Sequence, residues 1–365
     1  MASLLGLRTD SDKLRNLDFL RIFASVGIVY LHSHEFYYAE QVRDAAIART
    51  QGLGLFVDLF FVISGFVMGF VYDGRIERPR DYGSFMWKRI ARLYPLHLVV
   101  YALNVVVWAV LLTQRDSDTA PSFSADCMVA GALLVQSVYD CGGYSFNGVT
   151  WSISVEMVMY LLLPLLIAIG ARSRVALTAL SIVATCALVV AIYPSQRWAE
   201  APEILRGLAG FSFGYLVFKL KHLLPTVPGG SGLMLVLCAI ALVGMLLGVS
   251  QFVTMAILAA LFVVAVSADG AGQVHPLVER LCPLGQLTYS IYIWHRVIVL
   301  VLLNVVADKL FPGNMAVLIS MTAVTLVAIA LVSYAGYFLI EVPGRRALTR
   351  LLPREERKVV TDVAP

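Results

Sequence analysis

The chain has 365 residues, of which 59% are hydrophobic and only 14% are charged, with a mean hydropathy of +0.80. A soluble protein of this length would not carry so much apolar material, so the composition excludes that class and indicates a polytopic membrane protein. The net charge of +4 is small and gives no indication of nucleic acid as a partner.

Apolar windows long enough to span a bilayer occur about ten times. We therefore expect an all-α polytopic membrane protein with about ten transmembrane helices, near residues 17–36, 53–73, 93–113, 150–170, 174–193, 203–219, 231–248, 252–268, 286–306 and 315–340. An eleventh apolar run, 125–139, is too short for an ordinary span and indicates a re-entrant or interfacial helix.

The Lys and Arg residues set the orientation of these helices. With the N-terminus inside, 20 of the 28 basic residues fall on the cytoplasmic side. The outer side keeps Arg43, Arg49, Arg115, Arg197, Arg206 and Lys309. The positive-inside rule then predicts that both termini are cytoplasmic. We expect one transmembrane domain over residues 1–345 and a short basic cytoplasmic tail over 346–365.

The first window contains Arg21 and, eleven residues later, His32. At roughly 100° and 1.5 Å per helical residue, the two side chains share one face and lie about 16 Å apart along the axis. Ionisable groups in a membrane helix indicate a functional site. The alternative is that Arg21 reaches the cytoplasmic interface and His32 caps the far end.

Two carboxylates are expected at the depth of His32. Asp58 lies in the outer third of the second window, and Glu156 lies at a similar depth in the fourth. A carboxylate that orients the imidazole would make His32 a general base for a hydroxyl acceptor. A structural polar cluster and a proton relay in a transporter are the alternatives.

A basic cluster, Lys88, Arg89 and Arg92, stands at the cytoplasmic mouth of the third window. Planar guanidinium groups suit phosphate recognition, although a membrane-interface anchor would use the same residues. Together with Arg21, these residues could hold an anionic carrier whose extended arm reaches His32.

Secondary candidates are Ser64, Tyr292 and His295. Ser64 precedes Gly65, and this pair of small residues indicates close helix packing; no base adjoins Ser64 in the sequence. His295, in the ninth window, suits either catalysis or a structural partnership with an acidic residue.

The five cysteines show no metal-ligand spacing, and we expect no metal. Most of the cysteines suit small apolar packing positions. Cys127 and Cys141 flank a predicted outer loop, where they could form a disulfide, and the sequence leaves this open.

The ordered set of motifs resembles the integral-membrane acyltransferase family 3. The matching pieces are Leu17–Arg21 with His32, Val57–Phe66, Lys88–Pro95, Trp151–Glu156 and Tyr289–Tyr292 with His295. The resemblance implies a bacterial inner-membrane enzyme that transfers an acyl group, commonly acetyl, from acyl-CoA to a hydroxyl of a carbohydrate or other acceptor.

Carried over residue by residue, the resemblance makes His32 the candidate base and makes Arg21, Arg89 and Arg92 candidate acyl-CoA contacts. It makes Glu156 a candidate active-site carboxylate. Acceptors implied are exopolysaccharide, lipopolysaccharide or a lipid-linked sugar repeat. Direct transfer and an acyl-histidine intermediate both stay open, as does a transporter or flippase that uses the same ionisable residues. The oligomeric state is unconstrained.

Overall fold

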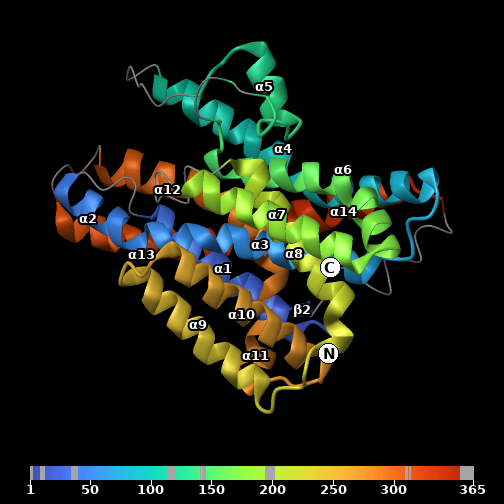
Figure 1. Cartoon of the computed structure of the whole chain (residues 1–365). Coiled ribbons are helices and arrows are strands. Elements are labelled where there is room, and N and C mark those ends of the chain that lie inside the picture. The colour runs from blue at the N-terminus through green and yellow to red at the C-terminus, as the bar shows by residue number, and fades with distance from the viewer. Residues whose placement is uncertain are drawn as a thin grey trace.

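The structure is a computed structural model that describes residues 3–8, 13–33, 40–112, 121–139, 141, 145–193, 202–308, 311 and 314–353. In this part of the chain the fold is helical, apart from a hairpin of two-residue strands, β1 (Ser3–Leu4) and β2 (Leu7–Arg8). The α-helices in chain order are α1 (Arg15–His32), α2 (Glu40–Thr50), α3 (Phe56–Tyr72), α4 (Pro79–Leu112), α5 (Ala125–Ala132), α6 (Trp151–Arg172), α7 (Arg174–Ile192), α8 (Glu203–Leu220), α9 (Gly230–Leu246), α10 (Gln251–Gly270), α11 (Pro276–Leu281), α12 (Thr288–Val299), α13 (Met315–Gly336) and α14 (Val342–Thr349) (Figure 1).

Seven helices of the described chain are long and apolar enough to cross a membrane. They are Arg43–Tyr72, Pro79–Leu111, Gly148–Arg172, Arg174–Ile192, Gln251–Gly270, Pro276–Ala307 and Met315–Thr349. The protein is therefore a multi-pass membrane protein.

Three further helices complete the predicted set. Helices α1 and α8 are not among the seven because each carries three charged residues within 18. Helix α9 is apolar but has only 17 residues. Each of the ten predicted windows overlaps a helix, so the helical positions are confirmed. That all ten cross the bilayer, and that both termini are cytoplasmic, stay predictions.

The predicted domain boundary at residue 345 lies inside α14. This helix packs against α4, where the Trp87 indole donates a hydrogen bond to the Leu348 carbonyl over 2.9 Å. The hairpin lies near the start of α14, because Leu7 is buried against Tyr337. The first residues of the predicted tail thus belong to the helical domain, while residues 354–365 lie outside the described residues.

The short run at 125–139 forms α5 and a following series of turns. Its short helix is confirmed, and its place relative to the membrane stays a prediction. Cys127 on α5 forms a disulfide with Cys141, and the two Cα atoms lie 5.7 Å apart. The structure thus forms the disulfide that the sequence left open.

Glycines bring α3 and α8 into backbone contact. A Cβ on Gly65 would overlap the Phe211 carbonyl, and a Cβ on Gly214 would overlap the Val62 carbonyl. Small residues at such an interface allow membrane helices to approach closely. The expectation that Gly65 permits close packing is confirmed.

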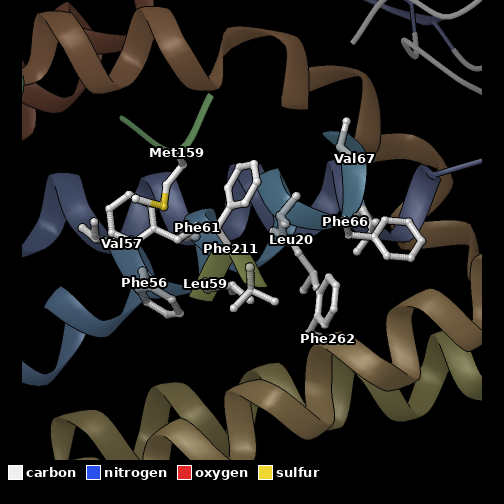
Figure 2. Close-up of a cluster of buried hydrophobic side chains, with 14 of the residues drawn as sticks. Leu20, Phe56, Val57, Leu59, Phe61, Phe66, Val67, Met159, Phe211 and Phe262 are labelled. Atoms are coloured by element: carbon white, nitrogen blue, oxygen red, sulfur yellow. The ribbon is translucent and has the colours of Figure 1, made fainter. Parts of the chain in front are cut away.

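Five helices share the apolar core beside this contact. Figure 2 shows Leu20 of α1, Phe66 of α3, Met159 of α6, Phe211 of α8 and Phe262 of α10 among the buried side chains. In Figure 1, α9, α10 and α11 form the lower part of the view and α5 lies at the top. The packing buries Asn16, Asp18 and Ser25 of α1, while Val26 and Tyr30 stay exposed.

Candidate active site

A cavity near the Arg21 end of α1 gathers three guanidinium groups. It is lined by Arg21 of α1, Arg89 and Arg92 of α4 and Glu156 of α6, and we call it the arginine cavity. Arg21, Arg89 and Arg92 thus line one cavity, and their role stays a prediction. Lys88 is absent from the described lining residues. The side chain of Lys88 points elsewhere because consecutive helical residues project about 100° apart.

Arg89 is a buried cation that aromatic rings surround. It is only 5% exposed, and its guanidinium donates a hydrogen bond to the Tyr72 hydroxyl over 2.9 Å. The guanidinium carbon lies 5.3 Å from the ring centre of Tyr72 and 5.8 Å from that of Tyr160. Among the described residues Arg89 forms no ion pair, and its Nε has no hydrogen-bond partner. A buried charge is costly without a counter-ion, so this position favours an anionic ligand.

Glu156 belongs to a hydrogen-bonded cluster in the same cavity. Its Oε1 accepts hydrogen bonds from the Ser64 hydroxyl at 2.5 Å and the Tyr160 hydroxyl at 2.6 Å. Its Oε2 takes part in neither bond. Ser64 thus has a carboxylate partner that its neighbours in the sequence did not reveal, because the partner comes from another helix.

Asp58 forms a buried ion pair on the other face of α3. Its carboxylate accepts two hydrogen bonds from Arg206 of α8, at 3.1 Å from Nε and 2.7 Å from Nη2. Arg206 also lies over the Trp151 ring, 4.7 Å from its centre. The sequence count had placed Arg206 among the outer loop residues; the structure instead buries it within α8.

The side chain that lies against His32 is a second histidine. The ring centres of His32 and His295 are 5.2 Å apart. His295 is fully buried, and its Nδ1 lies 3.2 Å from the Ile291 carbonyl. A carbonyl only accepts, so Nδ1 carries the proton and Nε2 of the neutral ring is an acceptor. Among the described residues this Nε2 has no hydrogen-bond partner.

The structure therefore does not bring His32, Asp58 and Glu156 together as predicted. Asp58 pairs with Arg206, and Glu156 bonds to Ser64 and Tyr160. Glu156 meets Ser64, which lies six residues beyond Asp58 on α3. Glu156 also lines the arginine cavity with Arg21, at the other end of α1 from His32.

His32 opens into a second cavity, which we call the histidine cavity. Its volume is about 750 Å³, against about 130 Å³ for the arginine cavity. Its polar lining residues are His32, Asp44, Gln51, Trp151, Glu203, Arg206, Gln251 and Tyr292.

Tyr292 and Val57 line both cavities and form the boundary between them. The Tyr292 hydroxyl lies 2.7 Å from the Ser152 hydroxyl and donates to the Val149 carbonyl over 3.0 Å. These contacts fasten α12 to the start of α6. In this part of the described chain, no group of three or more His, Cys, Asp or Glu side chains is placed to hold a metal ion.

Comparison with known proteins identifies the family of the chain. A family model described as an acyltransferase domain matches residues 14–334. The chain belongs to this acyltransferase family. The match includes every described residue of both cavities.

The membrane acyltransferase is similar to several curated proteins. It is 32% identical over 159 residues to the acyltransferase MdmB of Streptomyces mycarofaciens, covering 42% of this chain and 39% of that protein. It is 28% identical over 266 residues to the membrane-bound transacylase BcsY of Komagataeibacter xylinus, covering 66% and 64%. It is 27% identical over 198 residues to nodulation protein 10 of Rhizobium leguminosarum bv. viciae, covering 51% and 50%. The chain spans less than two thirds of the length of each of these relatives, and no solved structure matches it.

Two residues of the candidate site were missed from the sequence. The sequence did indicate Arg206, because a charged residue three positions inside an apolar window is a candidate functional residue. Tyr160 is one turn beyond Glu156, the spacing that lets helical side chains meet, but aromatic residues at this spacing are common in a core.

Proposed function

We propose that this membrane acyltransferase moves an acyl group, acetyl in the first instance, from acyl-CoA in the cytoplasm to a hydroxyl of a carbohydrate acceptor outside the bacterial inner membrane. The observation that carries the proposal is the pair of cavities that meet at Tyr292 and Val57. One cavity presents guanidinium groups and the other presents a histidine. A donor and an acceptor that enter separately would meet at this boundary.

The arginine cavity suits the acyl end of a phosphorylated carrier. Its volume of about 130 Å³ is well below the roughly 300–1,000 Å³ of pockets that hold a whole drug-sized ligand. Only the thin pantetheine arm would enter, and the nucleotide would stay at the mouth. Arg21, Arg89 and Arg92 supply the positive charge that the phosphates of the carrier favour.

The length of α1 matches the reach of this arm. Arg21 and His32 are eleven residues apart, which is about 16 Å of helical rise. Glu156 offers its second carboxylate oxygen to the arginine cavity, where it would accept a hydrogen bond from a pantetheine amide. In this proposal Glu156 positions the donor rather than the imidazole.

His32, assisted by His295, would accept and then release the proton of the acceptor hydroxyl. His32 takes the proton of the acceptor hydroxyl while the oxygen of that hydroxyl attacks the thioester carbonyl. The carbon–sulfur bond of the thioester then breaks and releases CoA thiolate. The proton then passes from His32 to the thiolate, which leaves as CoA thiol. The free Nε2 of His295 would accept a hydrogen bond from the His32 ring and leave the other His32 nitrogen as the base. An acyl group carried briefly on His32 would satisfy the same geometry.

Asp58 would act through Arg206. Their ion pair holds the guanidinium at the wall of the histidine cavity, where Arg206 also lies over Trp151. The third guanidinium nitrogen, Nη1, takes no part in this ion pair and is a donor for acceptor oxygens.

Two observations support the proposed orientation. The distribution of basic residues favours cytoplasmic termini. The Cys127–Cys141 disulfide lies in the segment between α4 and α6, and disulfides persist in the oxidising environment outside the cytoplasm.

The test uses purified protein in proteoliposomes with radiolabelled acetyl-CoA and, as acceptor, membranes of a strain from which the gene has been deleted. Wild type should transfer label to the carbohydrate fraction, and His32→Ala should lower transfer by at least about 10²-fold. Acetyl-CoA at about 100 times its dissociation constant should stabilise both proteins by roughly 2.7 kcal/mol. Transfer that survives in His32→Ala would remove the histidine from the mechanism. Movement of unmodified acceptor across the bilayer, without stabilisation by acetyl-CoA, would assign a flippase instead.

A further inference from the structure

A third cavity adjoins the histidine cavity on the side away from Tyr292. It lies between α5, the segment that follows it, and the first residues of α6 and α8, and we call it the loop cavity. Its volume is about 590 Å³. Trp151 and Glu203 line both the loop cavity and the histidine cavity, so the two are neighbours along one path.

The chemistry of the loop cavity is polar, aromatic and without positive charge. Its hydroxyl, amide and aromatic groups come from Ser122, Gln136, Ser137, Tyr139, Ser145 and Phe146. No Lys or Arg is among its described lining residues, and Glu203 stands at its junction with the histidine cavity. Hydroxyl and amide groups recognise polyhydroxylated ligands, and aromatic faces pack on the apolar C–H face of a sugar ring. A phosphate or a sugar acid would find no counter-charge among the described lining residues.

The walls of this cavity are fixed before any ligand arrives. The Cys127–Cys141 disulfide ties α5 to the following segment. Ser137 is held to α6, with its hydroxyl 2.6 Å from that of Ser154. The Gln136 amide nitrogen donates to the Thr150 hydroxyl over 2.9 Å, while its Oε1 is buried and has no partner among the described residues. Such rigidity lowers the entropic cost of binding.

Tyr139 is the aromatic side chain most open to a ligand. The residue is 44% exposed, and its hydroxyl donates to Asp126 over 2.7 Å. Hydrogen bonds from Tyr139 and Ser124 lower the pKa of Asp126 to about 2, so the carboxylate acceptor stays ionised at neutral pH. The bond from Tyr139 therefore fixes the outer end of the tyrosine ring, and the ring face is held in place.

Trp151 is fixed at the junction in a similar way. Arg206 covers its ring at 4.7 Å, and Phe61 meets it edge to face at 6.2 Å. A ligand that extends from His32 past Trp151 would enter the loop cavity.

We propose that the loop cavity is a second acceptor subsite, which binds the neutral sugar unit next to the one acylated at His32. This inference rests on the proposed function and deepens it: the acceptor is an oligosaccharide or polysaccharide of at least two units. Two adjoining cavities of about 750 and 590 Å³ each fall within the roughly 300–1,000 Å³ range of ligand sites.

The test compares acceptor lengths. Acceptors of one, two and four units are prepared by partial hydrolysis of surface polysaccharide from the deletion strain, and kcat/KM is measured with acetyl-CoA. Wild type should prefer two units over one by at least about tenfold, which corresponds to about 1.4 kcal/mol. Tyr139→Ala should bring the two-unit value down to the one-unit value.

Two variants separate the subsite from general damage. Tyr139→Phe keeps the ring and should keep most of the length preference. Tyr193→Ala removes an exposed tyrosine at the end of α7, outside the residues that line the three cavities, and should behave as wild type. Equal kcat/KM for one and two units in wild type, or a Tyr139→Ala loss that is equal for both lengths, would overturn the subsite while leaving acyl transfer in place. Failure to acylate any length would instead reject the carbohydrate acceptor, and the subsite with it.

Discussion

The imidazole rings of His32 and His295 lie with their centres 5.2 Å apart, one on α1 and the other on α12. The backbone carbonyl of Ile291 fixes the proton on Nδ1 of His295 and leaves Nε2 as an acceptor. A histidine thus stands where a carboxylate was expected. The pair also lies beside Tyr292, whose ring centre is 5.7 Å from that of His295, so it is close to the boundary of the two cavities.

The first prediction concerns this pair. His295→Asn keeps a donor near the Ile291 carbonyl but removes the acceptor at Nε2, so it should lower kcat by about 10²-fold while KM for acetyl-CoA changes by less than about threefold. The dependence of kcat on pH should also change, because one basic group that affects His32 is lost. Kinetics from pH 5 to 9 measure both effects. A uniform loss of activity with the wild-type pH profile would make His295 a packing residue only.

Arg89 and Lys88 form a matched pair of neighbouring cations. Arg89 lines the arginine cavity and Lys88 does not. Arg89→Gln should therefore raise KM for acetyl-CoA by about 10- to 100-fold, the size of one lost charge-assisted hydrogen bond. Lys88→Gln should change it by less than about threefold. Initial rates at varied acetyl-CoA measure the difference, and equal effects of the two substitutions would assign both residues to the membrane interface.

Tyr292 should keep water and acceptor away from the donor until transfer. Tyr292→Ala removes the shared wall of the two cavities, so acetyl-CoA hydrolysis without acceptor should rise by at least about tenfold while transfer falls. Tyr292→Phe keeps the ring and should show little hydrolysis. Release of free CoA thiol measures both variants. Hydrolysis at the wild-type rate in Tyr292→Ala would show that the boundary lies elsewhere.

Two glycine substitutions test the contact between α3 and α8. Gly65→Ala places a methyl group on the Phe211 carbonyl and should destabilise the protein by about 1–3 kcal/mol. Gly83→Ala, on α4, meets no atom within 4 Å and should stabilise it by roughly 0.5–1 kcal/mol, because alanine is the better helix former. Thermal unfolding in detergent measures both changes. A neutral result for Gly65→Ala would contradict the close helix contact.

Several features of the fold and site followed from the sequence because they depend on one helix at a time. The apolar windows located the helices, and the eleven-residue spacing put Arg21 and His32 on one line of α1. The spacing of Arg89 and Arg92 likewise placed both on neighbouring positions of α4. The Cys127–Cys141 disulfide was left open by the sequence, and the structure forms it.

Contacts between helices did not follow from the sequence. Glu156 was expected at the depth of His32 but lies with Arg21 in the arginine cavity, and the rotation of α3 and α6 about their axes was unknown. Packing of α3 on α8 through Gly65 and Gly214 turns Asp58 toward Arg206. The same packing leaves Ser64 on the side of α3 that meets Glu156.

The sequence by itself determined a multi-pass helical protein and the shared face of Arg21 and His32 on α1, because hydrophobicity and helical period are local properties of the chain. The acyltransferase family followed from the resemblance of its ordered motifs. Only the tertiary structure decided which side chains meet: His295 with His32, Arg206 with Asp58, and Tyr292 between the two cavities. The physical reason is that each of these contacts depends on the rotation of two helices about their axes. That rotation is fixed by packing across the whole bundle, which no single segment contains.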